Sequence, residues 1–136
     1  MGLDMYAVAR RTLTKEEKVQ KLIDMDVKPE EVELCTWRKH NALHGFMENI
    51  WLAKEGEEYI EFNCVPVYLD EVDLLELKNL IESEELYSMG TNGFFFGSSN
   101  YDQEDIDHHK PIDMQFVNDA LGLIEEGYVI EYSSWW

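Results

Sequence analysis

The sequence contains little cysteine and no long apolar run. Cys35 and Cys64 are the only cysteines in 136 residues, too few for a disulfide framework, so we expect two reduced, buried thiols. The apolar runs span only a few residues, whereas a helix needs about 20 to cross a bilayer. The first residues, MGLDMY, have neither the basic nor the apolar segment of a signal peptide. These absences predict a soluble, cytoplasmic protein.

Positive charge is nearly absent from the second half of the chain. Residues 56–136 contain nineteen acidic residues and only Lys78 and Lys110, whereas residues 1–55 contain ten acidic and nine basic residues. Most of the net charge of −18 therefore comes from one half, which predicts an acidic lobe beside a near-neutral one. Such a lobe repels phosphate backbones and anionic membranes and attracts basic surfaces. Direct binding to nucleic acid or to a membrane is therefore not expected.

Sequence signatures of common catalytic sites are also missing. The chain has no GxSxG motif, no P-loop, no GxGxxG and no kinase signature. Ser98 or Ser99 as nucleophile, His40 or His44 as base and Asp102 as the residue that orients the base would make a catalytic triad. Sequence alone, however, defines no geometry for them. The sequence leaves the question of an enzyme open and favours a protein without catalytic activity.

What the chain does contain is enough apolar and aromatic side chains for one core, which predicts a single domain over residues 1–136. Hydrophobic periodicity predicts three main helices, over residues 37–53, 70–85 and 110–126. Thr14 with Glu17 forms a capping-box pattern that begins a short peripheral helix over 14–28. Strands are expected at 3–9, 64–69, 94–96 and 128–132, with Pro66 placing the second at an edge or a bulge. The predicted fold is α+β: a small, mostly antiparallel or mixed four-stranded sheet with the three helices packed on it.

Four segments spread from end to end carry a resemblance. They are MGLDMY at 1–6, WRKHN at 37–41 with Leu43 and His44, GFFFGS at 93–98 with Tyr101 and Asp102, and YSSW at 132–135. Together they make the chain similar to a family of small uncharacterised proteins of phages and bacteria. The resemblance implies a phage-type accessory protein in the cytoplasm of a bacterial host cell. It supplies no mechanism.

A ligand site can be assembled from polar residues in these same segments. Arg38 and Lys39 would lie in the first turn of the helix over 37–53, where the helix dipole disfavours cations. A phosphate or carboxylate of a ligand would offset that cost, and so would nearby acids such as Glu33. The hypothetical site consists of Arg38, His40, Asn41 and His44 on the helix, Ser98, Ser99, Tyr101 and Asp102 on the following loop, and Ser133 on the last strand. It would hold a small anionic ligand such as a nucleotide, or process a phosphoester.

Two groups of residues have the composition of metal ligands, so a divalent metal is the candidate cofactor. His40 and His44 have the i, i+4 spacing of helical zinc ligands, but Asn41 stands where a metalloprotease has its glutamate. The second group contains four carboxylates, which Mg²⁺ and Ca²⁺ prefer, without the EF-hand pattern: Asp102, Glu104, Asp105 and Asp107. Each group also has an interpretation without a metal. The histidines would form hydrogen bonds to neighbouring loops, and the acids would lie on a solvated surface.

These observations lead to two functional hypotheses. In the first, the protein is non-enzymatic and binds a host protein with a basic surface through its acidic lobe, as an inhibitor or a mimic of DNA charge. In the second, it binds a small anionic ligand at the site around Arg38, His40 and His44. We further expect Trp135 to pack against the core, and we leave Trp136 open, since tryptophan also anchors interfaces.

Overall fold

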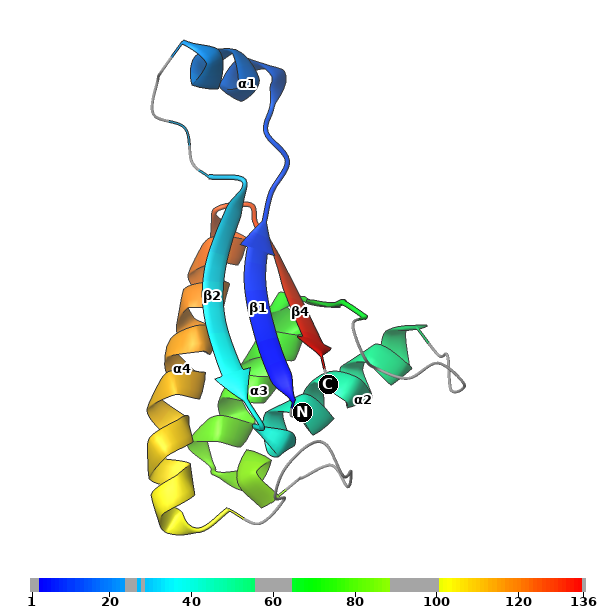
Figure 1. The fold of residues 1–136 in the computed structure, drawn as a ribbon, viewed down its shortest axis with the longest axis vertical. Coiled ribbons are helices and arrows are strands. Elements are labelled where there is room, and N and C mark those ends of the chain that lie inside the picture. The colour runs from blue at the N-terminus through cyan, green and yellow to red at the C-terminus, as the bar shows by residue number, and fades with distance from the viewer. Residues whose placement is uncertain (1–2, 24–26, 28, 56–64, 89–100, 136) are drawn as a thin grey trace.

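The computed structural model describes residues 3–23, 27, 29–55, 65–88 and 101–135 of the chain. Its elements follow one another from the blue N-terminus to the red C-terminus (Figure 1). They are β1 (Asp4–Arg10), α1 (Lys15–Leu22), β2 (Glu31–Arg38), α2 (Asn41–Glu55), β3 (Val67–Leu69), α3 (Glu71–Glu82), the short 3₁₀ helix η1 (Glu85–Ser88), α4 (Gln103–Glu125) and β4 (Val129–Trp135).

The four strands form one antiparallel sheet in the order β2-β1-β4-β3. This confirms the predicted α+β class, and it places β3, the strand that follows Pro66, at an edge. In the central strand β1, Met5, Ala7 and Ala9 are buried and the residues between them face the other side, as a two-residue period requires. Asp4 pairs with Trp135, so the first and last strands of the chain lie side by side.

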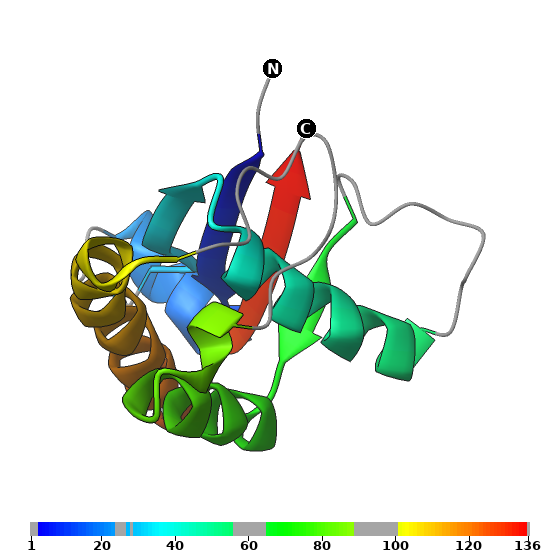
Figure 2. The same cartoon turned by 90° about the horizontal axis from the view of Figure 1, so that it is seen from below.

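Helices α2, α3 and α4 all lie on one face of the sheet (Figures 1 and 2). Leucines, isoleucines and aromatic residues of these helices meet the inward side chains of the strands in one core. No helix of the described residues covers the opposite face of the sheet, which we call the outer face. Trp135 lies on it and is 57% exposed. The expectation that Trp135 packs in the core was therefore wrong, because the pleat of β4 turns its buried neighbours Tyr132 and Ser134 inward and Trp135 outward.

Strand β2 occupies residues for which no strand was predicted. Glu31, Val32, Glu33 and Leu34 alternate charged and apolar residues, which is the signal of a half-buried strand. Its pairing with β1 shifts register between Ala7 and Val8, so Leu34 is the extra residue of a β-bulge. The predicted strand at 94–96 lies outside the described residues.

Two helices begin at other residues than predicted. Helix α2 begins at Asn41 rather than at residue 37, because Trp37 and Arg38 still belong to β2. Lys39 makes the turn between them with φ of 55° and donates its N–H to the carbonyl of Leu3 over 2.8 Å. Helix α4 begins at Gln103 rather than at residue 110 and runs through Pro111, because Asp102 and Asp105 form a capping box at its start.

Candidate functional site

The largest concentration of buried polar chemistry surrounds Asp113, on the inward side of α4. Its Oδ1 accepts a hydrogen bond from the indole N–H of Trp37 over 3.0 Å. Its Oδ2 accepts from the hydroxyl of Tyr87 over 2.9 Å and lies 2.7 Å from Nε2 of His40. The side chains of His40 and Asp113 have no exposed surface. One carboxyl group therefore joins β2, the start of α2, η1 and α4.

The network continues through the other ring nitrogen of His40. Nδ1 lies 2.8 Å from the hydroxyl of Tyr101, which also accepts the backbone N–H of Ala42 over 3.0 Å. The ring of His109 stacks on His40 with the centroids 4.1 Å apart. We call His40, Tyr87, Tyr101, His109 and Asp113, together with Trp37, the Asp113 network.

Burial controls the ionisation of the network. It lowers the pKa of His109 to about 4, with a further lowering from the neighbouring His40. It also raises the pKa of Tyr101 to about 12 and that of Tyr87 well above its usual value, where the nearby charge of Asp113 adds to the effect. In each case the low-dielectric surroundings disfavour the charged form. Both phenols are therefore protonated at neutral pH and act as hydrogen-bond donors or acceptors rather than as nucleophiles.

The structure divides the residues of the predicted ligand site. His40 and Tyr101 are hydrogen-bonded to each other, and Asn41 and His44 are buried on the same helix. Arg38 lies on the outer face, 73% exposed, with Nε 3.7 Å from Asp4 Oδ1. Ser133 pairs with Tyr6 on that face too. The grouping of Arg38 with the histidines was wrong because Arg38 is in a strand, and the sheet separates it from α2. Ser98 and Ser99 lie outside the described residues.

His44 belongs to a second buried contact, deeper along α2. Its Nδ1 lies 2.7 Å from the hydroxyl of Tyr132 in β4. Burial lowers the pKa of His44 to about 4, so its imidazole is neutral at pH 7. His40 and His44 therefore face different partners rather than one shared ion.

Two of the four carboxylates of the second predicted metal group, Asp102 and Asp105, cap helix α4. Asp102 accepts the N–H of Asp105 over 2.8 Å, and Asp105 accepts the N–H of Asp102 over 3.1 Å. Asp107 accepts from the side-chain amide of Gln103, while Glu104 is exposed. The described residues hold no group of three or more His, Cys, Asp or Glu that could bind a metal ion. The part of the chain that the structure describes therefore lends no support to a metal site.

The sequence contains a local signal for the Asp113 network. Asp113 stands three and four residues before Phe116 and Val117, which are buried on the same helix. An acid on the apolar stripe of a helix needs buried hydrogen-bond partners, so the pattern predicts a buried polar contact at Asp113 without naming the partners. Asp113 belongs to neither the predicted ligand site nor the predicted metal groups.

Exposed acids gather on the outside of the helical layer. Over residues 70–88 and 101–126 the chain has fifteen acidic residues and two lysines, Lys78 and Lys110. Asp113 is the only one of these acids that is fully buried. We call the others on α3, η1 and α4, together with Glu84 between α3 and η1, the acidic layer: Glu71, Asp73, Glu76, Glu82, Glu84, Glu85, Glu104, Asp105, Asp107, Asp119 and Glu125. Lys110 pairs with Glu84 over 3.0 Å.

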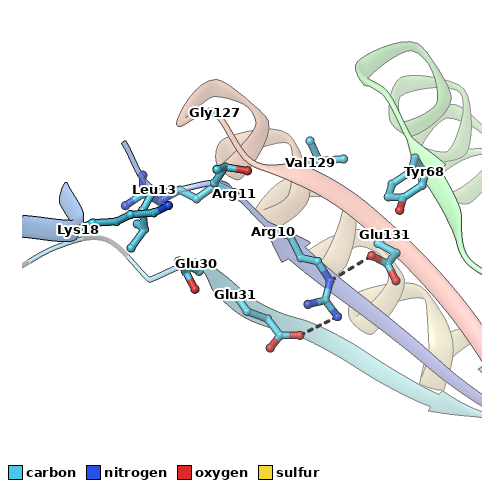
Figure 3. Close-up of a pocket in the computed structure, with 11 residues that line it drawn as sticks. Arg10, Arg11, Leu13, Lys18, Glu30, Glu31, Tyr68, Gly127, Val129 and Glu131 are labelled. Atoms are coloured by element: carbon cyan, nitrogen blue, oxygen red, sulfur yellow. Dashed lines mark hydrogen bonds and ion pairs between the residues drawn. The ribbon is translucent and has the colours of Figure 1, made fainter. Parts of the chain in front are cut away.

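A shallow concavity of about 820 Å³ lies where the sheet meets the segment that carries α1 (Figure 3). At its centre Arg10 is held between Glu31 at 3.0 Å and Glu131 at 3.1 Å. Leu13, Tyr68 and Val129 supply apolar surface. Three basic and three acidic residues line it: Arg10, Arg11, Lys18, Glu30, Glu31 and Glu131. Their charges balance, so the concavity has no preference for an anion.

Comparisons with protein families, with curated proteins and with solved structures found no match to this chain. Within the described residues, none of the helices has the length and apolarity needed to cross a membrane.

Proposed function

We propose that this protein is a non-enzymatic binding protein, an accessory protein of phage type, that docks the basic surface of a partner protein on its acidic layer. The proposal rests on one observation, the concentration of acidic residues in one half of the chain. The acids of the acidic layer belong to the helical layer of α3, η1 and α4, where two lysines, Lys78 and Lys110, accompany them. A surface with one sign of charge steers an oppositely charged partner and repels nucleic acid.

The Asp113 network supports a role in binding rather than in catalysis. A catalytic base must reach the proton that it removes from a substrate. His40 and Asp113 have no exposed surface, and their hydrogen bonds are made to other parts of the protein. The network thus holds the helical layer on the sheet and keeps the acidic layer in one arrangement.

The positions of the residues in the predicted ligand site give the small-ligand hypothesis less support than the acidic layer gives to protein binding. Arg38 was to supply the cation for an anionic ligand, yet it projects from the outer face, whereas His40 and His44 are buried beneath the sheet. The concavity near Arg10 is electrically balanced. Binding of a protein through the acidic layer therefore remains the better supported function.

Salt-dependent capture from a bacterial lysate tests the proposal. The protein is immobilised and washed with rising NaCl, from about 0.01 M to about 1 M, over which the Debye length falls from about 30 Å to about 3 Å. The triple variant Glu82→Lys, Asp119→Lys and Glu125→Lys changes the acidic layer. The matched control, Glu16→Lys, Glu30→Lys and Glu33→Lys, changes the net charge equally at exposed sites outside it.

We expect one partner to be retained by the native protein and the control, released at high salt, and lost by the acidic-layer variant. Retention that does not depend on salt would contradict the proposal. Equal loss from both triple variants would contradict it as well, because net charge rather than the acidic layer would then decide binding.

A further inference from the structure

Strand β2 forms the long edge of the sheet. Among the described residues it pairs with β1 alone, and it lies at the side of the sheet in Figure 1. An edge strand presents backbone N–H and C=O groups with which a strand of another chain can pair. The opposite edge, β3, has only three residues and follows Pro66, and both features protect an edge. Strand β2 has eight residues and no proline, so it is the edge at which another strand can be added.

The order of exposed and inward residues in β2 is the same in both directions along the strand. The exposed residues are Glu31, Glu33, Thr36 and Arg38, and the four others pack toward the core. The bulge produces this symmetry, because it leaves two inward residues, Leu34 and Cys35, at the centre of the strand. An antiparallel copy of β2 can therefore pair along all eight residues with exposed opposite exposed and inward opposite inward. A strand without the bulge would not allow this register, since its faces alternate strictly.

The charges at the two ends of β2 are complementary in this register. Glu31 of one copy lies opposite Arg38 of the other, and two-fold symmetry repeats the pair at the other end of the contact. Just beyond the strand, the exposed residues Glu30 and Lys39 have the same opposition of charge. Glu33 lies opposite an uncharged residue. Along the paired strands, therefore, no acid lies directly opposite an acid.

Ion pairs already present on the outer face extend this pattern into each copy. Arg10 lies 3.0 Å from Glu31, and Nε of Arg38 lies 3.7 Å from Oδ1 of Asp4. Arg10 is the β1 partner of Glu31, and Asp4 is the β1 partner of Arg38, so each pair shares a face of the sheet. Pairing of two β2 strands then completes a row of alternating basic and acidic side chains: Arg10 and Glu31 of one copy, followed by Arg38 and Asp4 of the other.

We propose that β2 pairs with β2 of a second copy of this chain, antiparallel and in the register that sets Glu31 opposite Arg38. The contact is isologous, because the same strand of each copy meets itself, so it closes with two-fold symmetry at a dimer. Backbone hydrogen bonds supply the affinity, and the charged pairs fix the register. Repulsion between the two acidic layers opposes the contact and is screened by salt, over about 8 Å at about 0.15 M. This contact is separate from the partner binding proposed above and does not depend on it.

Sedimentation equilibrium of the full chain, from about 1 μM to about 1 mM in about 0.15 M NaCl, tests for the dimer. We expect a monomer–dimer equilibrium. Arg38→Glu sets acids opposite each other at both ends of the contact and should weaken dimerisation at least about tenfold. The control Lys21→Glu, at an exposed lysine of α1, changes the net charge equally and should leave the equilibrium unchanged. A protein that stays monomeric throughout, or a dimer that Arg38→Glu leaves intact, overturns the proposal.

A charge exchange then identifies the pairing and its register. Glu31→Arg alone sets two arginines opposite each other at both ends and should weaken the dimer as Arg38→Glu does. Mixed one to one, the two variants place an acid opposite an arginine at both ends, so a heterodimer is expected. The double variant Glu31→Arg and Arg38→Glu has the native net charge and should form a dimer by itself. A mixture or a double variant that stays monomeric shows that these residues do not pair across the contact and overturns the proposal.

Discussion

At the scale of the residue, Asp113 joins parts of the chain that are far apart in sequence. Its partners are Trp37 in β2, His40 in the turn before α2 and Tyr87 in η1, and Asp113 itself lies in α4. A buried carboxylate is tolerated only when such donors replace the water it has lost. The three donors in turn depend on Asp113, since none of their side chains is more than 7% exposed.

Asp113→Ala should therefore lower the free energy of unfolding by about 3–5 kcal/mol, the cost of leaving the partners of a buried charge unsatisfied. Urea denaturation measures the change. The control Asp119→Ala removes an exposed carboxylate of the same helix, which accepts a hydrogen bond from the Gln115 side chain, and should change stability by less than about 0.5 kcal/mol. Similar effects from the two substitutions would show that Asp113 is not an anchor of the fold.

Two histidines, the buried His44 and the half-buried His109, make stability depend on pH. The pKa of His44 and that of His109 are both lowered by burial to about 4, while an unfolded histidine titrates near about 6.5. Between these values the unfolded chain binds more protons than the folded one, so stability is lost as the pH falls from about 6.5 to about 4. Each histidine contributes a slope of up to about 1.4 kcal/mol per pH unit.

Chemical denaturation at several pH values tests this dependence. His44→Gln and His109→Gln should each flatten the loss of stability in that window. His108→Gln, at the exposed neighbour of His109, should leave the profile as it is. A profile that is steep only below pH 4 would contradict the assignment, because carboxylates such as Glu17, whose pKa is lowered to about 2 chiefly by its hydrogen bond with Arg11, would then dominate.

At the scale of the element, two glycines at the end of α4 have opposite roles. Gly122 lies inside the helix, whereas Gly127 has φ of +94°, and an added Cβ would meet no atom within 4 Å at either position. Gly122→Ala should raise the free energy of unfolding by about 0.5–1 kcal/mol, because alanine loses less backbone entropy in a helix. Gly127→Ala should lower it by about 1–2 kcal/mol, because L-residues are strained at positive φ. Urea denaturation measures both changes. If the two substitutions changed the free energy of unfolding in the same direction, this account would be contradicted.

At the scale of the whole molecule, the charge of −18 opposes folding. The acidic layer brings carboxylates together that are farther apart in the unfolded chain, and their repulsion is screened by salt. The free energy of unfolding should therefore rise as NaCl increases from about 0.01 M to about 0.1 M. The triple variant Glu82→Lys, Asp119→Lys and Glu125→Lys should show a smaller rise. Stability independent of salt in the native protein would argue against repulsion within the layer.

Local patterns in the sequence determined several features that the structure confirms. They include the α+β class, the alternation of β1, the capping box of Thr14 and Glu17, and the edge position of the strand that follows Pro66. Each depends on residues only a few positions apart, such as a period of two or a cap three residues from its partner. The imbalance of charge between the two halves of the chain is likewise a property of the sequence alone.

Other features were decided only by the tertiary structure. Thr36 and Trp37 resembled the start of a helix, but pairing with β1 draws them into β2, since the strand ladder and burial of Trp37 outweigh local preference. Pro111 resembled a helix start, yet α4 runs through it because Asp102 caps the helix earlier and Ile106 packs against the core. The partners of Asp113 lie 26 to 76 residues away. Contacts over such separations exist only once the sheet and helices have packed, and no local pattern encodes them.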